Sequence, residues 1–182
     1  QGILSIAAVI GRAALEDGLH IKQAEVHGMS QRGGDVQSNL RISSSEIHAD
    51  LIPQGQADLI VSLEPMEALR YLPWLASDGW VITNTVPLVN IPDYPDAEAL
   101  RRELEALPHA VTLDIDALAR AAASPRSANM VLLGAAAPFL DIDAAKLEAG
   151  IRDIFARKGD AIVEMNLAAF RAGYDVTQKQ TK

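Results

Sequence analysis

The stretch ADLIVSLEP, residues 57–65, decides the fold class of this chain. Its first seven letters are almost continuously apolar, which is typical of a central parallel strand buried on both faces. Pro65 suits the first position of a helix, because the amide hydrogen that proline lacks would be unpaired there. We therefore expect a strand over residues 57–63 that leads into a helix, the basic unit of an α/β fold.

Glu64 stands at the junction between this strand and this helix, and it has two interpretations. The carboxyl end of a strand is where α/β folds place ligand-binding residues. A carboxylate at a helix start is also stabilised by the helix dipole, without any role in function. We favour the second interpretation and keep the first open.

Before this unit, residues 3–17 form a pattern that is apolar nearly all round, which predicts a buried helix with Gly18 as its C-cap. A strand is expected at 19–26, with a bulge or a change of packing face, because its apolar residues change phase. Residues 35–43 alternate in polarity and predict a half-solvated, antiparallel strand. Residues 46–52 are expected to form one more short strand.

After the unit, the helix is expected to reach about Ala76, and further elements alternate along the chain. They are a strand at 80–83, a connector at 86–96 with three prolines, a helix at 96–107, a strand at 110–113 and a helix to Ala123 capped by Asp114 or Asp116.

The C-terminal part is expected to be helical. Helices are predicted at 127–140, after Asp143, and from Asp160 to Gly173, with a polar and disordered tail at 175–182. Asn129 in the first of them is interpreted as a cap or core hydrogen-bonder, with a functional role left open. We predict one α/β domain: a three-layer sandwich with a mixed, mostly parallel sheet and a helical C-terminal subregion.

Composition limits the function classes. The 182 residues include 49% hydrophobic residues and carry a formal net charge of −8, which argues against nucleic acid and anionic membrane surfaces as partners. Cysteine is absent, so the chain itself offers no disulfide, thiolate nucleophile or cysteine-ligated iron–sulfur cluster. The four histidines show no metal-ligand spacing, and we expect no metal site.

A second informative stretch is HGMSQRGG, residues 27–34. Its glycines allow close approach of another molecule, and Arg32 with the amides of Gly33 and Gly34 could bind a phosphate or carboxylate. The alternative is an ordinary glycine-rich connector with a solvated arginine. From residue chemistry alone, the chain has one anion- or partner-binding loop and no complete set of catalytic residues.

The segments HGMSQRGGDVQSNLRI (27–42), LIPQGQADLIVSLEPMEALR (51–70) and NMVLLGA (129–135) resemble the small subunits of indolepyruvate:ferredoxin oxidoreductases. These subunits match the gamma domain of the wider 2-oxoacid:ferredoxin oxidoreductase family. Gln1-Gly2-Ile3 is similar to the end of that family's GxGGQG turn. We therefore expect a gamma-type domain over residues 1–174, whose first strand and glycine turn would precede Gln1.

The resemblance implies coenzyme A-dependent oxidative decarboxylation of a 2-oxoacid, with indolepyruvate or another arylpyruvate as the expected substrate. Thiamine diphosphate, Mg, iron–sulfur clusters and coenzyme A would act in the complex and not on this chain alone. The expected partners are a large catalytic subunit and, through it, ferredoxin, in the cytoplasm; a homodimer of the isolated chain is left open. The residues expected to contact the partner or a cofactor are Gln1, Gly2, His27, Gln31, Arg32, Gly33 and Gly34.

Two other functions are kept as alternatives. The chain could be a stand-alone α/β nucleotide- or metabolite-binding module without a redox partner. It could also be a structural or regulatory subunit that uses the same fold.

Overall fold

The computed structural model describes residues 2–27 and 36–180. The helices are α1 (Ile3–Glu16), α2 (Pro65–Arg70), α3 (Ala97–Glu105), α4 (Ile115–Ala122), α5 (Ala128–Ala136), α6 (Ala144–Phe155) and α7 (Asp160–Gln180). The strands are β1 (His20–His27), β2 (Val36–Ser43), β3 (Ala57–Ser62), β4 (Leu75–Asn84) and β5 (Ala110–Leu113). Short 3-10 turns adjoin α2, α5 and α6.

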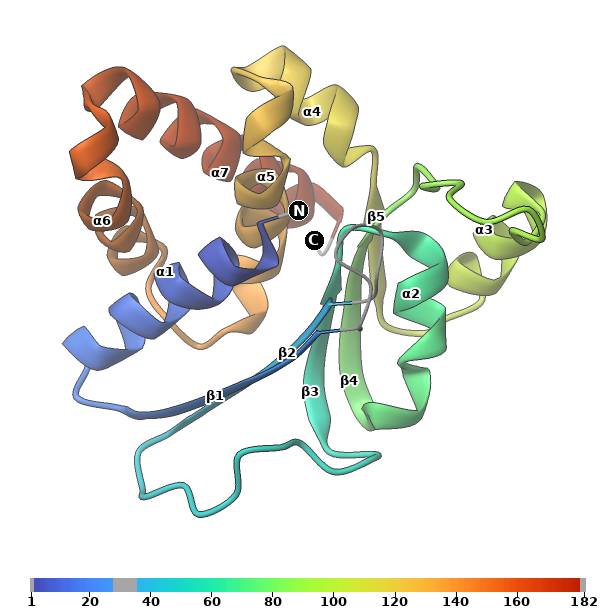
Figure 1. The fold of residues 1–182 in the computed structure, drawn as a ribbon, viewed down its shortest axis with the longest axis horizontal. Coiled ribbons are helices and arrows are strands. Elements are labelled where there is room, and N and C mark those ends of the chain that lie inside the picture. The colour runs from blue at the N-terminus through green and yellow to red at the C-terminus, as the bar shows by residue number, and fades with distance from the viewer. Residues whose placement is uncertain (1, 28–35, 181–182) are drawn as a thin grey trace.

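The centre of the molecule is a parallel sheet in the order β3-β4-β5. Figure 1 shows α2 and α3 on one side of this sheet and the remaining helices on the other, so the chain has three layers. Val81 and Ile82 of β4 are fully buried, as expected for a middle strand covered on both faces. The predicted α/β class, with mostly parallel pairing and a helical C-terminal part, is confirmed. The 57–63 run is a parallel strand, as expected. It lies at the edge of the three-stranded sheet and is only partly buried, so the central position predicted for it is wrong.

The remaining strands, β1 and β2, form a separate antiparallel sheet and do not extend the parallel one. Their register is unbroken from His20 opposite Ser43 to His27 opposite Val36. Of the two explanations given for the phase change in the first strand, the bulge is therefore wrong. Ile21 packs against the core, whereas Val26 is 51% exposed. The apolar residues change phase because the core no longer covers the end of the strand, and not because a residue is inserted.

The expected short strand at residues 46–52 does not form. Its backbone groups bind side chains of β2 instead of a neighbouring strand: Arg41 Nη1 donates to the carbonyls of Ala49 and Leu51 at 3.1 and 3.3 Å. Asn39 Oδ1 accepts from the amide of Ile52 at 3.1 Å. The polar face of β2 is thus covered by this segment, and Asn39 is buried although a half-solvated strand was expected.

The helix after β3 ends at Arg70 and not near Ala76. Pro73 disfavours the helical conformation for the residue before it, and a 3-10 turn follows over Leu72–Trp74. β4 then begins at Leu75, which is earlier than the strand predicted from residue 80.

Two glycines set the contact between α5 and α7. A Cβ atom at Gly134 would lie 1.8 Å from the carbonyl oxygen of Phe170, and one at Gly173 would lie 1.9 Å from that of Val131. Gly173 therefore serves close helix packing. We predicted that it ends the last helix, and that prediction is wrong. α7 continues to Gln180, so the expectation of a disordered tail from residue 175 is wrong for residues 175–180.

The core lies between these helices and the parallel sheet. α5 is buried on every side from Met130 to Ala136, and α1 buries Ile6, Val9 and Ile10 against the same cluster. Among the described helices, none combines the length and apolarity needed to cross a membrane.

Candidate functional site at the carboxyl edge of the parallel sheet

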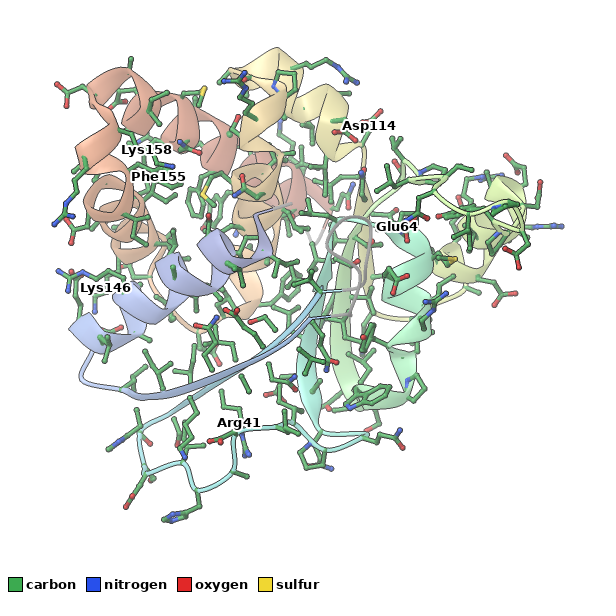
Figure 2. The ribbon with its side chains drawn as sticks, in the orientation of Figure 1. Arg41, Glu64, Asp114, Lys146, Phe155 and Lys158 are labelled. Carbon is green, nitrogen blue, oxygen red and sulfur yellow. The ribbon has the colours of Figure 1, made fainter. Side chains whose placement is uncertain are left out.

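The three parallel strands end at one edge, and a polar side chain stands at each end. Glu64 follows β3, Asn84 is the last residue of β4, and Asp114 follows β5. Figure 2 shows Glu64 and Asp114 at the same end of the molecule, beside the carboxyl ends of the strands. This is the edge at which open α/β sheets bind ligands.

Asn84 joins the three strand ends. Its Nδ2 donates to the carbonyl of Leu63 at 3.4 Å and to Asp116 Oδ2 at 3.2 Å. Its Oδ1 accepts from the amides of Val86 at 3.3 Å and Ile115 at 3.1 Å. Asn84 is only 4% exposed, and both donor and both acceptor positions of its side-chain amide have hydrogen-bond partners within the protein.

Glu64 carries out the role that we favoured for it. Its Oε2 accepts from the amide of Glu67 at 2.8 Å and so caps α2. Its Oε1 accepts from the amide of Leu88 at 3.3 Å and from the Tyr94 hydroxyl. Burial, and then the hydrogen bond to the Glu64 carboxylate, raise the pKa of Tyr94 well above its ordinary value. The Tyr94 proton is held in this bond throughout the neutral range.

The end of β5 is capped in a similar way. Asp114 Oδ1 accepts from the amide of Ala117 at 2.8 Å, so Asp114, and not Asp116, is the cap of α4. Asp116 binds Asn84 instead. The edge is thus acidic and tied together by structural hydrogen bonds. Within residues 2–27 and 36–180, no group of three or more His, Asp or Glu side chains could hold a metal ion.

The start of α1 is fixed by a contact with α5. Gly2 has φ +84°, a conformation that favours glycine, and a Cβ atom there would lie 2.6 Å from Asn129 Nδ2. Asn129 Nδ2 donates to the carbonyl of Gly2 at 3.3 Å, and its Oδ1 accepts from the amide of Met130 at 3.1 Å. Asn129 is therefore a structural hydrogen-bonder, the first of its two interpretations.

Of the predicted site residues, the structure describes two. Gly2 lies at the start of α1, and His27 is the last residue of β1, opposite Val36. Outside the described residues lie Gln1, Gln31, Arg32, Gly33 and Gly34.

The sequence analysis missed the parts played by Asn84 and Tyr94. An asparagine at the carboxyl end of a strand was a usable signal for Asn84, since a buried amide there must find partners. No local signal identified Tyr94, whose partner Glu64 is distant in sequence.

Comparison with known proteins decides the family. The sequence model for pyruvate ferredoxin/flavodoxin oxidoreductase matches residues 1–176. The chain belongs to this family. The resemblance seen in residues 27–42, 51–70 and 129–135 is thereby confirmed.

Relatives within the family agree. The chain is 36% identical to the indolepyruvate oxidoreductase subunit IorB of Methanothermobacter thermautotrophicus, over 96% of this chain and 91% of that protein. It is 34% identical to IorB of Archaeoglobus fulgidus, over 96% of this chain and 89% of that one. A 2-oxoglutarate synthase subunit KorC of A. fulgidus is 26% identical over 100% of this chain and 85% of its own length.

Solved structures share the fold. The gamma subunit of a keto/oxoacid ferredoxin oxidoreductase from Geobacter sulfurreducens superposes with a TM-score of 0.66 at 22% identity, over 96% of this chain and 90% of that one. The 2-oxoglutarate:ferredoxin oxidoreductase of Magnetococcus marinus gives a TM-score of 0.75 at 20% identity. That match covers 98% of this chain and 29% of the longer chain, so this family's fold also occurs as one part of a larger polypeptide.

Proposed function

We propose that this chain is the small subunit of a 2-oxoacid:ferredoxin oxidoreductase that acts on indolepyruvate or a related arylpyruvate. The observation that carries the proposal is the 36% identity to an indolepyruvate oxidoreductase subunit, which extends over 96% of this chain and 91% of the relative. Relatives named for other 2-oxoacids are more distant, at 26% for KorC and 25% for the ketoisovalerate oxidoreductase subunit VorA.

In this proposal the chain supports chemistry that takes place on a large partner subunit in the cytoplasm. The partner would hold thiamine diphosphate, Mg and iron–sulfur clusters, which supply decarboxylation and electron transfer to ferredoxin. This chain has no cysteine, and its residues therefore do not fit a cysteine-ligated cluster. This chain would contribute the carboxyl edge of the sheet, whose strand ends are joined by hydrogen bonds, and the loop at residues 27–34. We assign the loop to contact with coenzyme A or the partner.

The first test is isolation of the native protein from its own cells. We expect a large partner to be recovered with it, thiamine diphosphate in the sample, and broad visible absorption from iron–sulfur clusters. The isolated complex should reduce ferredoxin with indolepyruvate only when coenzyme A is present. A colourless preparation without a partner would refute the proposal and favour the stand-alone binding module, whose ligand would then be sought in the same sample.

A second test addresses the loop. In the assembled complex, Arg32→Ala is expected to raise the KM for coenzyme A by about tenfold or more, since hydrogen bonds to charged groups contribute roughly 1.5–3 kcal/mol. Arg157→Ala, which removes an exposed arginine from the turn after α6, is the matched control and should leave the KM unchanged. An Arg32→Ala complex that assembles and turns over normally would exclude the coenzyme A contact.

A further inference from the structure

The connector between β4 and α3, residues 85–96, combines an irregular backbone with exposed apolar side chains. Leu88 is 48% exposed and Val89 is 68% exposed, and Val86 and Ile91 are also exposed. A surface segment of this kind has little apolar burial to hold it in place. Its position must therefore depend on hydrogen bonds to the body of the protein.

Those hydrogen bonds converge on one place. Two hydrogen bonds from residues 87–95 to the body of the protein end at the Glu64 carboxylate. One oxygen, Glu64 Oε1, accepts both from the Leu88 amide at 3.3 Å and from the Tyr94 hydroxyl.

Glu64 itself cannot move with the connector. It lies two residues after the end of β3, is 9% exposed, and its second oxygen caps α2. The body of the protein therefore supplies a fixed acceptor, and the connector supplies two donors on either side of Val89 and Ile91. Two bonds to one buried carboxylate close residues 88–94 into a loop against the carboxyl edge.

We propose that Glu64 is a latch for the connector, and that residues 87–95 leave the carboxyl edge as a unit when the bonds to this carboxylate are lost, while the amide of Val86 stays bound to Asn84. Pro87 at the start of the connector and Pro65, Leu100 and Leu104 on the body are among the residues that line a small cavity of about 20 Å³. Opening of the latch would remove Pro87 from the wall of this cavity. The latch is independent of the proposed function, since it rests on contacts within this chain.

Amide hydrogen exchange of the full chain tests the latch. In Glu64→Gln we expect the Leu88 amide and the peptide over residues 87–95 to exchange at least tenfold faster than in the unsubstituted chain. Tyr94→Phe removes one of the two bonds but leaves the cap of α2 intact, and it should give a smaller increase in the same peptide. Unchanged exchange of this peptide in both variants would overturn the proposal.

A control variant and a control measurement make the test specific. Asp93→Asn removes the same unit of charge from an exposed position on the connector and should leave the exchange unchanged. Peptides from α5 and α7, measured in the same experiment, report whether the body remains folded. If Glu64→Gln loses protection there as well, Tyr94→Phe alone decides: faster exchange confined to residues 87–95 supports the latch, and unchanged exchange excludes it.

Discussion

Replacing Gly134 or Gly173 by alanine is expected to lower the free energy of unfolding by about 3 kcal/mol or more, at the upper end of the cost of overpacking a core. The new Cβ atom would lie 1.8 Å from the Phe170 carbonyl oxygen in the first case and 1.9 Å from that of Val131 in the second. Both obstacles are backbone atoms within helices, so α5 and α7 must separate to admit the methyl group. Urea denaturation and the thermal midpoint measure the loss.

The control is Gly11→Ala in α1. A Cβ atom there would lie 3.9 Å from Ile21 Cδ1, an ordinary contact, and alanine has the higher helix propensity. This variant should unfold at the same denaturant concentration as the unsubstituted chain or at a higher one. The double variant Gly134→Ala/Gly173→Ala should cost less than the sum of the single variants, since one separation of the helices relieves both clashes. Unfolding midpoints unchanged in both single variants would mean that the two helices are not in contact here.

Removal of the Asn84 side chain is expected to have the second largest effect. Asn84→Ala leaves the amides of Val86 and Ile115 and the carbonyl of Leu63 without their partner. Each buried unsatisfied group costs roughly 1–3 kcal/mol, and water entering the site offsets part of this, so we expect a loss of about 2–4 kcal/mol. The free energy of unfolding, from urea titration, checks the value.

Asn90→Ala is the matched control, because Asn90 is an exposed asparagine on the neighbouring connector. Its substitution should change the stability by less than about 0.5 kcal/mol, as for most surface positions. Asn84→Asp adds a second comparison: it keeps the acceptors but places a carboxylate beside Asp116, so it should also destabilise the protein at neutral pH. Equal free energies of unfolding for Asn84→Ala and Asn90→Ala would contradict the role of Asn84 in joining the three strand ends.

The parts of the fold that could be predicted from the sequence are those fixed by nearby residues. Gly18 ends α1 with a positive φ, and Asp114 and Asp143 cap the helices that follow them, because a cap and its partner amide lie within three residues. The 57–63 run was recognisable as a parallel strand from its consecutive apolar residues, whereas its place at the edge of the sheet depends on distant strands and was not predicted.

The predictions that were wrong concern partners far away in the chain. Residues 46–52 are not a strand because Arg41 and Asn39 of β2 bind their backbone groups. The helix expected to end at Gly173 continues because that glycine faces Val131 of α5. In both places the local pattern fits two structures, and a contact that the sequence does not display selects between them.

The candidate site also divides into features set by nearby residues and features set by distant ones. The capping role of Glu64 could be predicted from its place before Pro65, whereas its bonds to Leu88 and Tyr94 could not. The loop at residues 27–34 stays a prediction, supported by its glycines, Arg32 and the family to which the chain belongs.

The packing of α5 against α7 also bears on how the protein is made. α5 is buried all round by its neighbours, yet α7, which crosses it at Gly134 and Gly173, begins only at Asp160. A ribosome that adds about 5–20 residues per second would expose α5 in the emerging chain for a time on the order of seconds before its cover is synthesised. During that interval the most apolar helix of the protein is a target for chaperones and for aggregation.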